Sequence, residues 1–583
     1  MRIVFAKAAI LAAAAAAAPL AAQAGADERL SALTDGWYAY QLAEYRQIEQ
    51  PDGSTEPGDS FASVTPAANL ARADKAGAAL ASLDAILSAQ LSPAARIDAA
   101  VFRTLLQEQV GDARFREWEM PFDSDSDFWS YLPARRAFDD AEGYRRYLGR
   151  IRDLPRYFGE QIANARAGLA RGFSVPAVTL AGRDASIAAQ VVDDAEKSPF
   201  WAAFAQMPAR IPAGEAAQLK AEARLAIAQS AIPAFRDLLA FYRGEYMVRA
   251  RSTLAAEALP DGQAYYAQQI RQYTTLALTA DEIHRTGLAE VERITAQMER
   301  VKADAGFAGD LKSFIAFLRT DPQFTAKSAD ELMGVSSYAA KRVDDVIGRY
   351  FGLLPRKRFG IRPVDPAIAP FYTAGRGGLD ACQMNTYDLP SRPLYNIPAL
   401  TLHECAPGHS FQMALALERE AAPRFRRQVY FSGFGEGWGL YTEFLGEEMG
   451  IYRTPYERFG KLSYEMWRAA RLVIDTGIHS RGWSRERAIA YLADHTALSK
   501  REVETEVDRY ISWPGQALAY KLGEMTIRKQ RSRAERELGD RFDIRKFHDV
   551  LLALGSVPLP VFEDRITAFI ADGGQGLAGV KYD

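Results

Sequence analysis

The stretch that decides the fold of the chain's second half is His403-Glu404-Cys405-Ala406-Pro407-Gly408-His409, which places two imidazoles and a carboxylate close together. In the usual HExxH spacing, two histidines at positions i and i+4 share one face of a helix. Here the second histidine follows the first by six residues. At about 100° per residue, six steps turn an ideal helix by about 600°. The two rings would then point well apart, so the motif requires an irregularity in the helix.

Pro407 and Gly408 supply such an irregularity. Proline removes a backbone donor and clashes with the preceding turn of a helix, while glycine tolerates unusual dihedral angles. A bulge or a break at these residues would bring His409 back toward His403. The alternative is a helix that ends at Pro407 and leaves His409 in a loop with a structural role.

A third metal-binding group is expected in Gly433-Phe434-Gly435-Glu436-Gly437-Trp438-Gly439. Each glycine costs a helix up to about 1 kcal/mol relative to alanine, so the missing side chains must allow a close approach. We expect that approach to bring Glu436 to His403 and His409. Two imidazoles, one carboxylate and an open position are what a catalytic zinc ion requires. The sequence therefore predicts one Zn²⁺ ion, with Glu404 as the general base toward a zinc-activated water.

Glu443 follows Glu436 by seven residues and lies on roughly the same helix face. We expect it to orient one imidazole through a hydrogen bond. An exchange of roles between Glu436 and Glu443 is the alternative.

Residues 1–24 are typical of a secretory signal peptide, with a basic start, an apolar run from Ala8 to Leu20 and a small-residue cleavage site at Ala22-Gln23-Ala24. The run is short for a membrane span, and no cysteine follows the cleavage site to accept a lipid. We therefore expect an exported protein without a stable membrane anchor, periplasmic if the source is a Gram-negative bacterium.

The 583-residue chain has an ordinary globular composition, with 48% hydrophobic residues, 25% charged residues and a formal net charge of -3. This balance gives no basic footprint for nucleic acid. Its two cysteines, Cys382 and Cys405, both lie near the motif. They form a disulfide or remain as two buried thiols.

The expected fold is mainly α, a large helical body with a deep cleft and a small β-sheet beside the metal-binding helix. Residues 25–250 form an N-terminal helical region, and residues 251–583 form the catalytic region. Capping boxes predict helix starts at Thr279, Ser328 and Ser499. The sheet is expected between residues 356 and 398, where proline and glycine are frequent and short runs have strand character.

Further side chains are candidates for substrate contact or catalysis. A peptide strand pairing with the sheet edge would pass Asn385 and Tyr387. His479 could donate to an oxyanion, with a structural capping role as the alternative. Tyr510 and Tyr520 could stabilise a tetrahedral intermediate, with core packing as the alternative. Arg509 and Lys521 could pair with a peptide carboxylate.

The motif His403–His409, together with Asp475–Trp483 and Pro514–Lys521, resembles a bacterial domain-of-unknown-function family with the signature HExxPGH. That family is distantly similar to helical gluzincins such as thimet oligopeptidase, the Taq-type carboxypeptidases and angiotensin-converting enzyme. The resemblance implies an enclosed site for short peptides, a zinc-ligating Glu436 followed by Glu443, and a downstream catalytic tyrosine such as Tyr520. The two-residue insertion between the histidines departs from the gluzincin pattern.

The sequence thus predicts an exported zinc metallopeptidase that hydrolyses short peptides through a metal-activated water. Glu404 would accept a proton from this water, and Tyr520 or His479 would support the oxyanion. One alternative is a metal-dependent hydrolase of a non-peptide amide or ester. Another is a non-catalytic exported binding protein with a structural metal.

Overall fold

The computed structural model describes residues 25–50, 54–123, 127–134, 136–366, 369–419 and 422–582. Helices dominate these residues, as predicted, and two small sheets accompany them. The predicted signal peptide, residues 1–24, lies outside the described residues. Among the helices that are described, none is both long enough and apolar enough to cross a membrane.

The chain divides into two compact units. The first contains the described residues up to Thr253, together with residues 259–261 and 423–425. It begins with a helix over residues 25–44. Its further elements are β1 (Gln47–Glu49), β2 (Thr55–Pro57), α2 (Pro66–Leu87), α3 (Pro93–Phe115), α4 (Ala141–Arg171), α5 (Ala177–Leu180), α6 (Asp184–Ala188), α7 (Ala202–Ala205), α8 (Ala213–Ala226), α9 (Ile232–Phe241) and α10 (Met247–Arg249).

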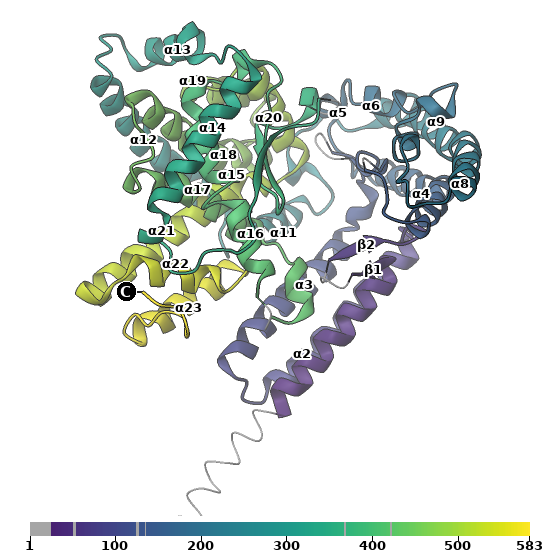
Figure 1. The fold of residues 1–583 in the computed structure, drawn as a ribbon, viewed down its shortest axis with the longest axis horizontal. Helices are drawn as coiled ribbons and strands as arrows, with labels where there is room; N and C mark the ends of the chain where they lie inside the picture. The colour runs from purple at the N-terminus through teal and green to yellow at the C-terminus, as the bar shows by residue number, and fades with distance from the viewer. Residues whose placement is uncertain are drawn as a thin grey trace, which may run out of the picture. The chain divides into compact units, whose positions relative to one another are not determined.

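The first unit combines a long helical hairpin with a cluster of helices around α4. Helices α2 and α3 lie side by side (Figure 1), and each begins with a serine or threonine cap followed by proline. Helix α4 buries Tyr144, Leu148 and Ile151 on one face, the spacing of an amphipathic helix. Aromatic residues from α9 and its surroundings complete this core, including Phe235, which packs edge-on against Phe158.

The second unit contains the remaining described residues. Its elements are α11 (Gly262–Thr274), α12 (Ala280–Asp304), α13 (Leu311–Thr320), α14 (Ala329–Val346), β3 (Gly360–Pro363), β4 (Gly375–Arg376), β5 (Ala381–Met384), α15 (Ile397–Glu404), α16 (His409–Leu417), α17 (Ser432–Glu448), α18 (Pro455–Arg481), α19 (Arg485–His495), α20 (Lys500–Ser512), α21 (Ala519–Leu538), α22 (Ile544–Leu552) and α23 (Leu559–Ala571).

Two of the three predicted capping boxes form completely. Thr279 and Glu282 cap each other at the start of α12, and Ser499 and Glu502 do so at the start of α20. At α14 the Ser328 side chain caps the helix, but Glu331 accepts from the backbone of Lys327 instead. These local signals therefore placed the three helix starts correctly.

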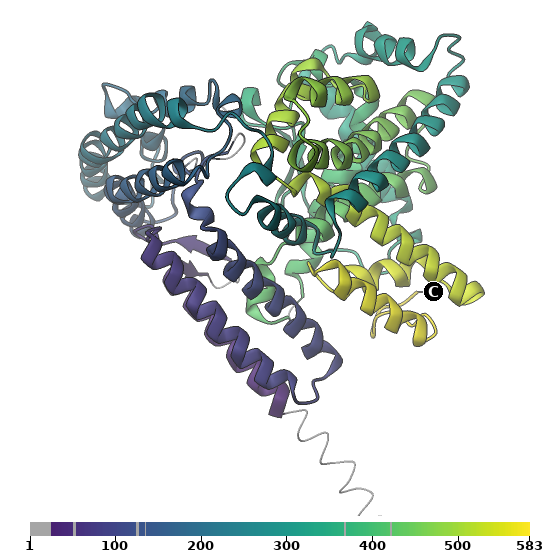
Figure 2. The ribbon, with the colours of Figure 1, turned by 180° about the vertical axis from the view of Figure 1, so that it is seen from behind.

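Helix α18 is the centre of the second unit. It packs along α12 and contacts α15, α17 and α21, while α17 packs along α21. The view from behind shows the same body of helices (Figure 2). Most of α18 is buried, including charged residues such as Glu465, Arg468 and Arg471. Polar groups of this central helix must therefore find partners inside the protein.

The three-stranded sheet lies in the predicted segment and has the order β3-β5-β4. Strand β3 is parallel to β5, with Ile361 opposite Cys382, and β4 is antiparallel to β5, with Gly375 opposite Met384. The short strand β4 forms one edge and contacts α15. The sheet thus stands beside the helix that carries His403.

Candidate metal centre

The motif folds as two helices separated by a sharp break. Helix α15 ends at Glu404, and α16 begins at His409. Between them the Ala406–Pro407 peptide bond is cis. A Cβ atom on Gly408 would lie 1.9 Å from the carbonyl oxygen of His403, so the chain folds back onto α15 at a position that only glycine can occupy.

This break brings the two histidines together. Their ring centroids are 4.8 Å apart and the ring planes are nearly perpendicular, at 86°. The helix ends earlier than Pro407, and His409 opens the next helix rather than lying in a loop. Each histidine therefore has a fixed backbone, one at the end and one at the beginning of a helix.

Helix α17 carries Glu436 to the same place because its glycines permit close packing. A Cβ atom on Gly439 would lie 2.7 Å from Cε1 and Nε2 of His403, and one on Gly437 would lie 2.6 Å from Cα of Gly523 in α21. Side chains at these two positions would push α17 away from both neighbours. The glycines lower the intrinsic stability of helix α17, but they allow it to pack closely against both neighbours, which larger residues would prevent.

Three candidate ligand atoms converge at this centre. Oε2 of Glu436 lies 3.5 Å from Nε2 of His403 and 3.4 Å from Nε2 of His409. The three residues offer donor atoms that all lie within 4.8 Å of one another. The structure therefore places together the three side chains that the sequence predicts as metal ligands.

Glu443 lies on the other side of the His403 ring. Its Oε1 atom accepts a hydrogen bond from Nδ1 of His403 at 2.8 Å, and it lies 3.7 Å from Nη2 of Arg468. All three side chains are buried. In its neutral form with the proton on Nδ1, His403 would present the lone pair of Nε2 toward Glu436 and His409. This position suits orientation of the imidazole and not ligation.

The centre is strongly polarised. Burial disfavours a charged imidazole, yet the carboxylates of Glu436 and Glu443 raise the pKa of His403 to about 10. Burial likewise opposes ionisation of Glu436, but His403 and His409 hold its pKa well below the usual range. A cation is therefore favoured between these groups, whether it is a proton or a metal ion.

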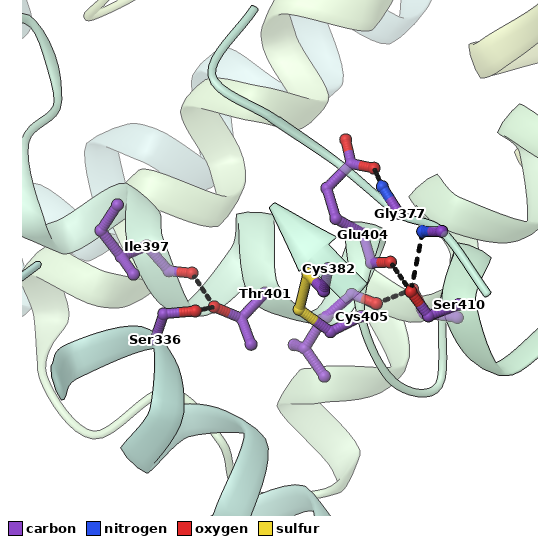
Figure 3. Close-up of a disulfide and its surroundings, with 11 residues drawn as sticks. Ser336, Gly377, Cys382, Ile397, Thr401, Glu404, Cys405 and Ser410 are labelled. Atoms are coloured by element: carbon purple, nitrogen blue, oxygen red, sulfur yellow. Dashed lines mark hydrogen bonds between the residues drawn. A yellow bond between two sulfur atoms is a disulfide. The ribbon is translucent and has the colours of Figure 1, made fainter. Parts of the chain in front are cut away.

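Glu404 faces the sheet from the end of α15. Its Oε2 atom accepts a hydrogen bond from the backbone N–H of Gly377 at 2.7 Å, directly after β4. Ser410 donates to the Glu404 carbonyl at 3.1 Å and accepts from the N–H of Gly378 at 3.1 Å (Figure 3). The loop after β4 therefore fixes one carboxylate oxygen of Glu404.

A disulfide fastens the sheet to the motif. Cys382 in β5 is bonded to Cys405, the residue that follows Glu404, and the two Cα atoms are 5.3 Å apart (Figure 3). This settles the pairing that the sequence left open. The bond joins the strand next to β4 to the end of α15.

Tyr430 is a site residue that the sequence analysis missed. Its hydroxyl donates to Oε1 of Glu436 at 3.1 Å. The Tyr430 side chain as a whole is 52% exposed, but desolvation of its hydroxyl and the neighbouring Glu436 and Tyr520 raise its pKa well above the ordinary value, so the hydroxyl keeps the proton it donates. The available signal was Gly435, whose missing side chain leaves room for the tyrosine ring.

Tyr520 lies at the start of α21 and packs against Leu440 of α17. The guanidinium of Arg471 stacks 4.4 Å from its ring centroid. Its hydroxyl has no hydrogen bond to any other residue in the described parts of the chain. Tyr520 therefore remains a candidate for contact with a reacting group.

His479 and Lys521 are not available for the roles predicted for them. His479 is fully buried, and its ring nitrogens bond the backbone N–H of Ala256 and the carbonyl of Tyr510. The Lys521 ammonium is also fully buried and lies 2.9 Å from each of Glu465 and Glu524. Both residues stabilise helix packing, which corrects the expectation of an oxyanion donor and a carboxylate partner.

Tyr510 and Arg509 are likewise engaged within the fold. The buried Tyr510 hydroxyl accepts from Trp467 at 2.8 Å and from Arg471 at 2.9 Å. Arg509 donates to Gln516 at 3.0 Å. The predicted catalytic role of Tyr510 is therefore replaced by a structural one, and Arg509 has an internal partner in place of a peptide carboxylate.

Asn385 and Tyr387 follow β5 but differ in exposure. Asn385 is 1% exposed, and its amide donates to the carbonyls of Ala369, Tyr372 and Thr373. Its buried side chain closes a loop and does not face a substrate groove, contrary to the prediction. Tyr387 is 44% exposed, and its substrate contact stays a prediction.

Comparison with known proteins gives a family and a fold. No curated protein matches the sequence. A solved structure from Colwellia psychrerythraea, provisionally titled a lipoprotein, has 23% identity and a TM-score of 0.82 over 94% of this chain and 99% of that one. A second, from Shewanella oneidensis, is provisionally titled a lipoprotein of unknown function; it has 18% identity and a TM-score of 0.60 over 92% of this chain and 98% of that one. The family model described as "Bacterial protein of unknown function (DUF885)" matches residues 51–566, and the chain therefore belongs to that family.

Proposed function

We propose that the protein is an exported zinc metallopeptidase that hydrolyses short peptides, with one Zn²⁺ ion held by His403, His409 and Glu436. The observation that carries this proposal is the spacing of the donor atoms. Two donors bound tetrahedrally to one zinc at about 2.0–2.1 Å lie about 3.3–3.5 Å apart. The distances from Glu436 Oε2 to the two imidazoles are 3.5 and 3.4 Å, longer than typical N–H···O hydrogen bonds of about 2.7–3.2 Å.

The chemistry of the donors supports the same ion. Two imidazole nitrogens and one carboxylate oxygen suit zinc, and three protein ligands leave a position for water. The Glu443 carboxylate on Nδ1 of His403 matches the partner that zinc-bound histidines commonly have. The proposed likeness to helical gluzincins rests on this arrangement together with the spacing of Glu436 and Glu443.

Each residue around the centre has a separate role in the proposed hydrolysis. A bound zinc ion would supply an acidified water and polarise the scissile carbonyl. Gly377 holds Oε2 of Glu404, which leaves Oε1 to take the proton from the attacking water and pass it to the leaving amine. Tyr520 would donate to the developing oxyanion. The edge strand β4 would pair with the backbone of the peptide.

Export and substrate size belong to the same proposal. Residues 1–24 have the pattern of a signal peptide, and the two structural relatives are provisionally titled lipoproteins. The Cys382–Cys405 disulfide suits an oxidising compartment outside the cytosol. Short peptides are the proposed substrates because the gluzincin resemblance implies an enclosed site.

The test is Glu404→Gln in the purified protein, incubated with a mixed peptide pool whose products are identified by mass spectrometry. Zinc content should stay at the wild-type level, while peptide turnover should fall by about 10²–10⁴-fold because the proton acceptor is lost. Glu292→Gln on the exposed side of α12 is the matched control and should retain full turnover. Cleavage that persists in Glu404→Gln would disprove the mechanism.

The same assay separates the alternatives. A zinc-loaded wild type that cleaves amide or ester probes but no peptide is a hydrolase of another substrate class. Peptide binding without any cleavage by the zinc-loaded wild type indicates a binding protein.

A further inference from the structure

Tyr430 lies just before α17, outside every motif that the sequence singles out, and its hydroxyl contacts a proposed metal ligand. The two oxygens of Glu436 have different partners: Oε2 faces His403 and His409, and Oε1 accepts a hydrogen bond from Tyr430. We infer that Tyr430 is a positioning residue that fixes the Glu436 carboxylate so that a single oxygen faces the metal. This inference rests on the zinc site of the proposed function.

The ring of Tyr430 is seated by a neighbouring glycine. A Cβ atom on Gly435 would lie 2.3 Å from Cε2 and 2.5 Å from the hydroxyl oxygen of Tyr430. Gly435 lies in α17 directly before Glu436, where alanine would otherwise favour the helix by up to about 1 kcal/mol. The missing side chain therefore makes the space in which the tyrosine reaches the carboxylate.

The hydrogen bond from Tyr430 determines how many coordination positions of the metal the Glu436 carboxylate would occupy. A carboxylate whose second oxygen is free can rotate and bind a metal through both oxygens, as carboxylates often do with larger cations. The hydrogen bond from Tyr430 occupies Oε1 and opposes that rotation. Three single donors then remain, and a position stays open for water.

The structure also offers a way to displace Tyr430 without removing its hydroxyl. Tyr430→Phe deletes the donor and keeps the ring, whereas Gly435→Ala keeps the donor and pushes the ring from its place. Both changes should therefore have the same effect on Glu436. Removal of a hydrogen-bond partner of a metal ligand typically costs about 10–100-fold in metal affinity or activity.

The experiment measures zinc affinity by competition with a chromogenic chelator and records the visible spectrum of the cobalt(II)-loaded protein, using the full exported chain. Tyr430→Phe and Gly435→Ala should each weaken zinc binding by about tenfold or more and alter the intensity of the cobalt bands, which reports coordination number. With peptide substrate, kcat should fall while KM changes little.

Two matched controls separate this role from general effects on folding. Tyr338→Phe removes the hydroxyl of a tyrosine with similar exposure, 54% against 52% for Tyr430. Gly334→Ala adds a methyl group to a helix at a site with no atom within 4 Å. Both controls should keep wild-type zinc affinity and the wild-type cobalt spectrum, and thermal unfolding of the metal-free variants reports intact folding.

Wild-type zinc affinity and cobalt spectra in both Tyr430→Phe and Gly435→Ala would overturn the inference. A loss of affinity in Tyr430→Phe alone would overturn it as well, because the ring would not be held where Gly435 admits it. These readouts do not depend on catalysis. A wild type that binds zinc but cleaves no peptide therefore refutes the peptidase proposal. The zinc affinities of the variants still decide whether Tyr430 positions Glu436.

Discussion

The second unit buries two clusters of charge that are arranged in opposite ways. Around Glu465 of α18, the ammonium groups of Lys461 and Lys521 lie 2.9 Å from its carboxylate oxygens, and Arg293 also donates to it. Around Glu436 of α17, the nearest imidazole nitrogens lie 3.4 and 3.5 Å from its carboxylate. The first cluster is closed by direct hydrogen bonds, and the second keeps its donors at the spacing of a shared ion.

This difference separates the cluster around Glu465 from the cluster proposed to bind zinc. Burial raises the pKa of a carboxyl, but the cations beside Glu465 hold its pKa well below the usual range. That cluster needs no further ion, because Glu290 and Glu524 supply additional carboxylates for Lys521. Buried charge alone therefore does not identify a functional site, and the proposal for Glu436 rests on donor atoms that converge at more than direct hydrogen-bonding distance.

The largest effect is expected from removing a ligand of the open cluster. His409→Ala should weaken zinc binding by more than about 100-fold, beyond the loss typical of outer partners. The free energy of unfolding of the metal-free protein should fall by less than the roughly 3–5 kcal/mol that a buried ion pair loses with one partner, because Glu436 keeps His403 beside it. Chelator competition and urea denaturation measure the two quantities. His495→Ala is the control, and equal zinc affinity in both variants would refute the assigned centre.

The closed cluster should respond in the opposite way. Lys521→Met leaves Glu465 and Glu524 short of a cation in the interior, which should cost about 3–5 kcal/mol of unfolding free energy. Lys529→Met, at an exposed position of the same helix, should cost almost nothing. Urea denaturation of the metal-free proteins decides the matter, and a stability loss below about 1 kcal/mol would show that Lys521 is dispensable.

A substitution of Glu443 tests whether this residue is a metal ligand or a hydrogen-bond partner of His403. Glu443→Gln keeps an acceptor for Nδ1 of His403 but removes the charge, so zinc affinity should fall by about 10–100-fold. The affinity is measured as for His409→Ala. A loss as large as that of His409→Ala would assign Glu443 as the ligand in place of Glu436.

Asp475 is a buried carboxyl group that has no cation beside it among the described residues, and its pKa shows the effect. Burial raises its pKa to about 7, although Tyr266 and the backbone of Gly515 donate hydrogen bonds to it. A pKa raised on folding means that the native state binds more protons between about pH 4 and 7. Stability from this group is present below about pH 4 and is lost as the pH rises through 7.

Asp475→Asn should therefore flatten the pH dependence of stability, with a difference from wild type that grows by about 1 kcal/mol or more between pH 4 and 7. Urea denaturation of both proteins across this range gives the difference. Parallel curves for the two proteins would contradict the raised pKa.

The clustering of the three candidate ligands was predictable because it depends on short motifs in the sequence. His403, His409 and Glu436 are spaced, with glycines at the positions of close packing, so that few backbone conformations would let the three side chains bind one ion. The helix starts and the sheet followed from caps and from the composition of the segment before the motif. These features depend on residues near one another in the sequence.

The wrong assignments share a different cause. His479, Lys521 and Asn385 have suitable side chains, but their hydrogen-bonding capacity is used by groups far away in the sequence or on the backbone. The type of a residue does not reveal which partners in the fold use up the hydrogen-bonding capacity of its side chain. Tyr430 was overlooked for the converse reason, because its role arises from the space left by Gly435 and not from a motif.

The Cys382–Cys405 disulfide bears on which metal the proposed centre would take up. Cys405 directly follows Glu404, so a reduced chain would offer a thiolate next to the ligand set while the metal is being loaded. Thiolates favour soft ions such as copper(I). Oxidation removes both sulfurs from competition and leaves a nitrogen and oxygen set. At the proposed site, protein made in a reducing cytosol should therefore be more prone to mismetallation than protein in which the Cys382–Cys405 bond has formed.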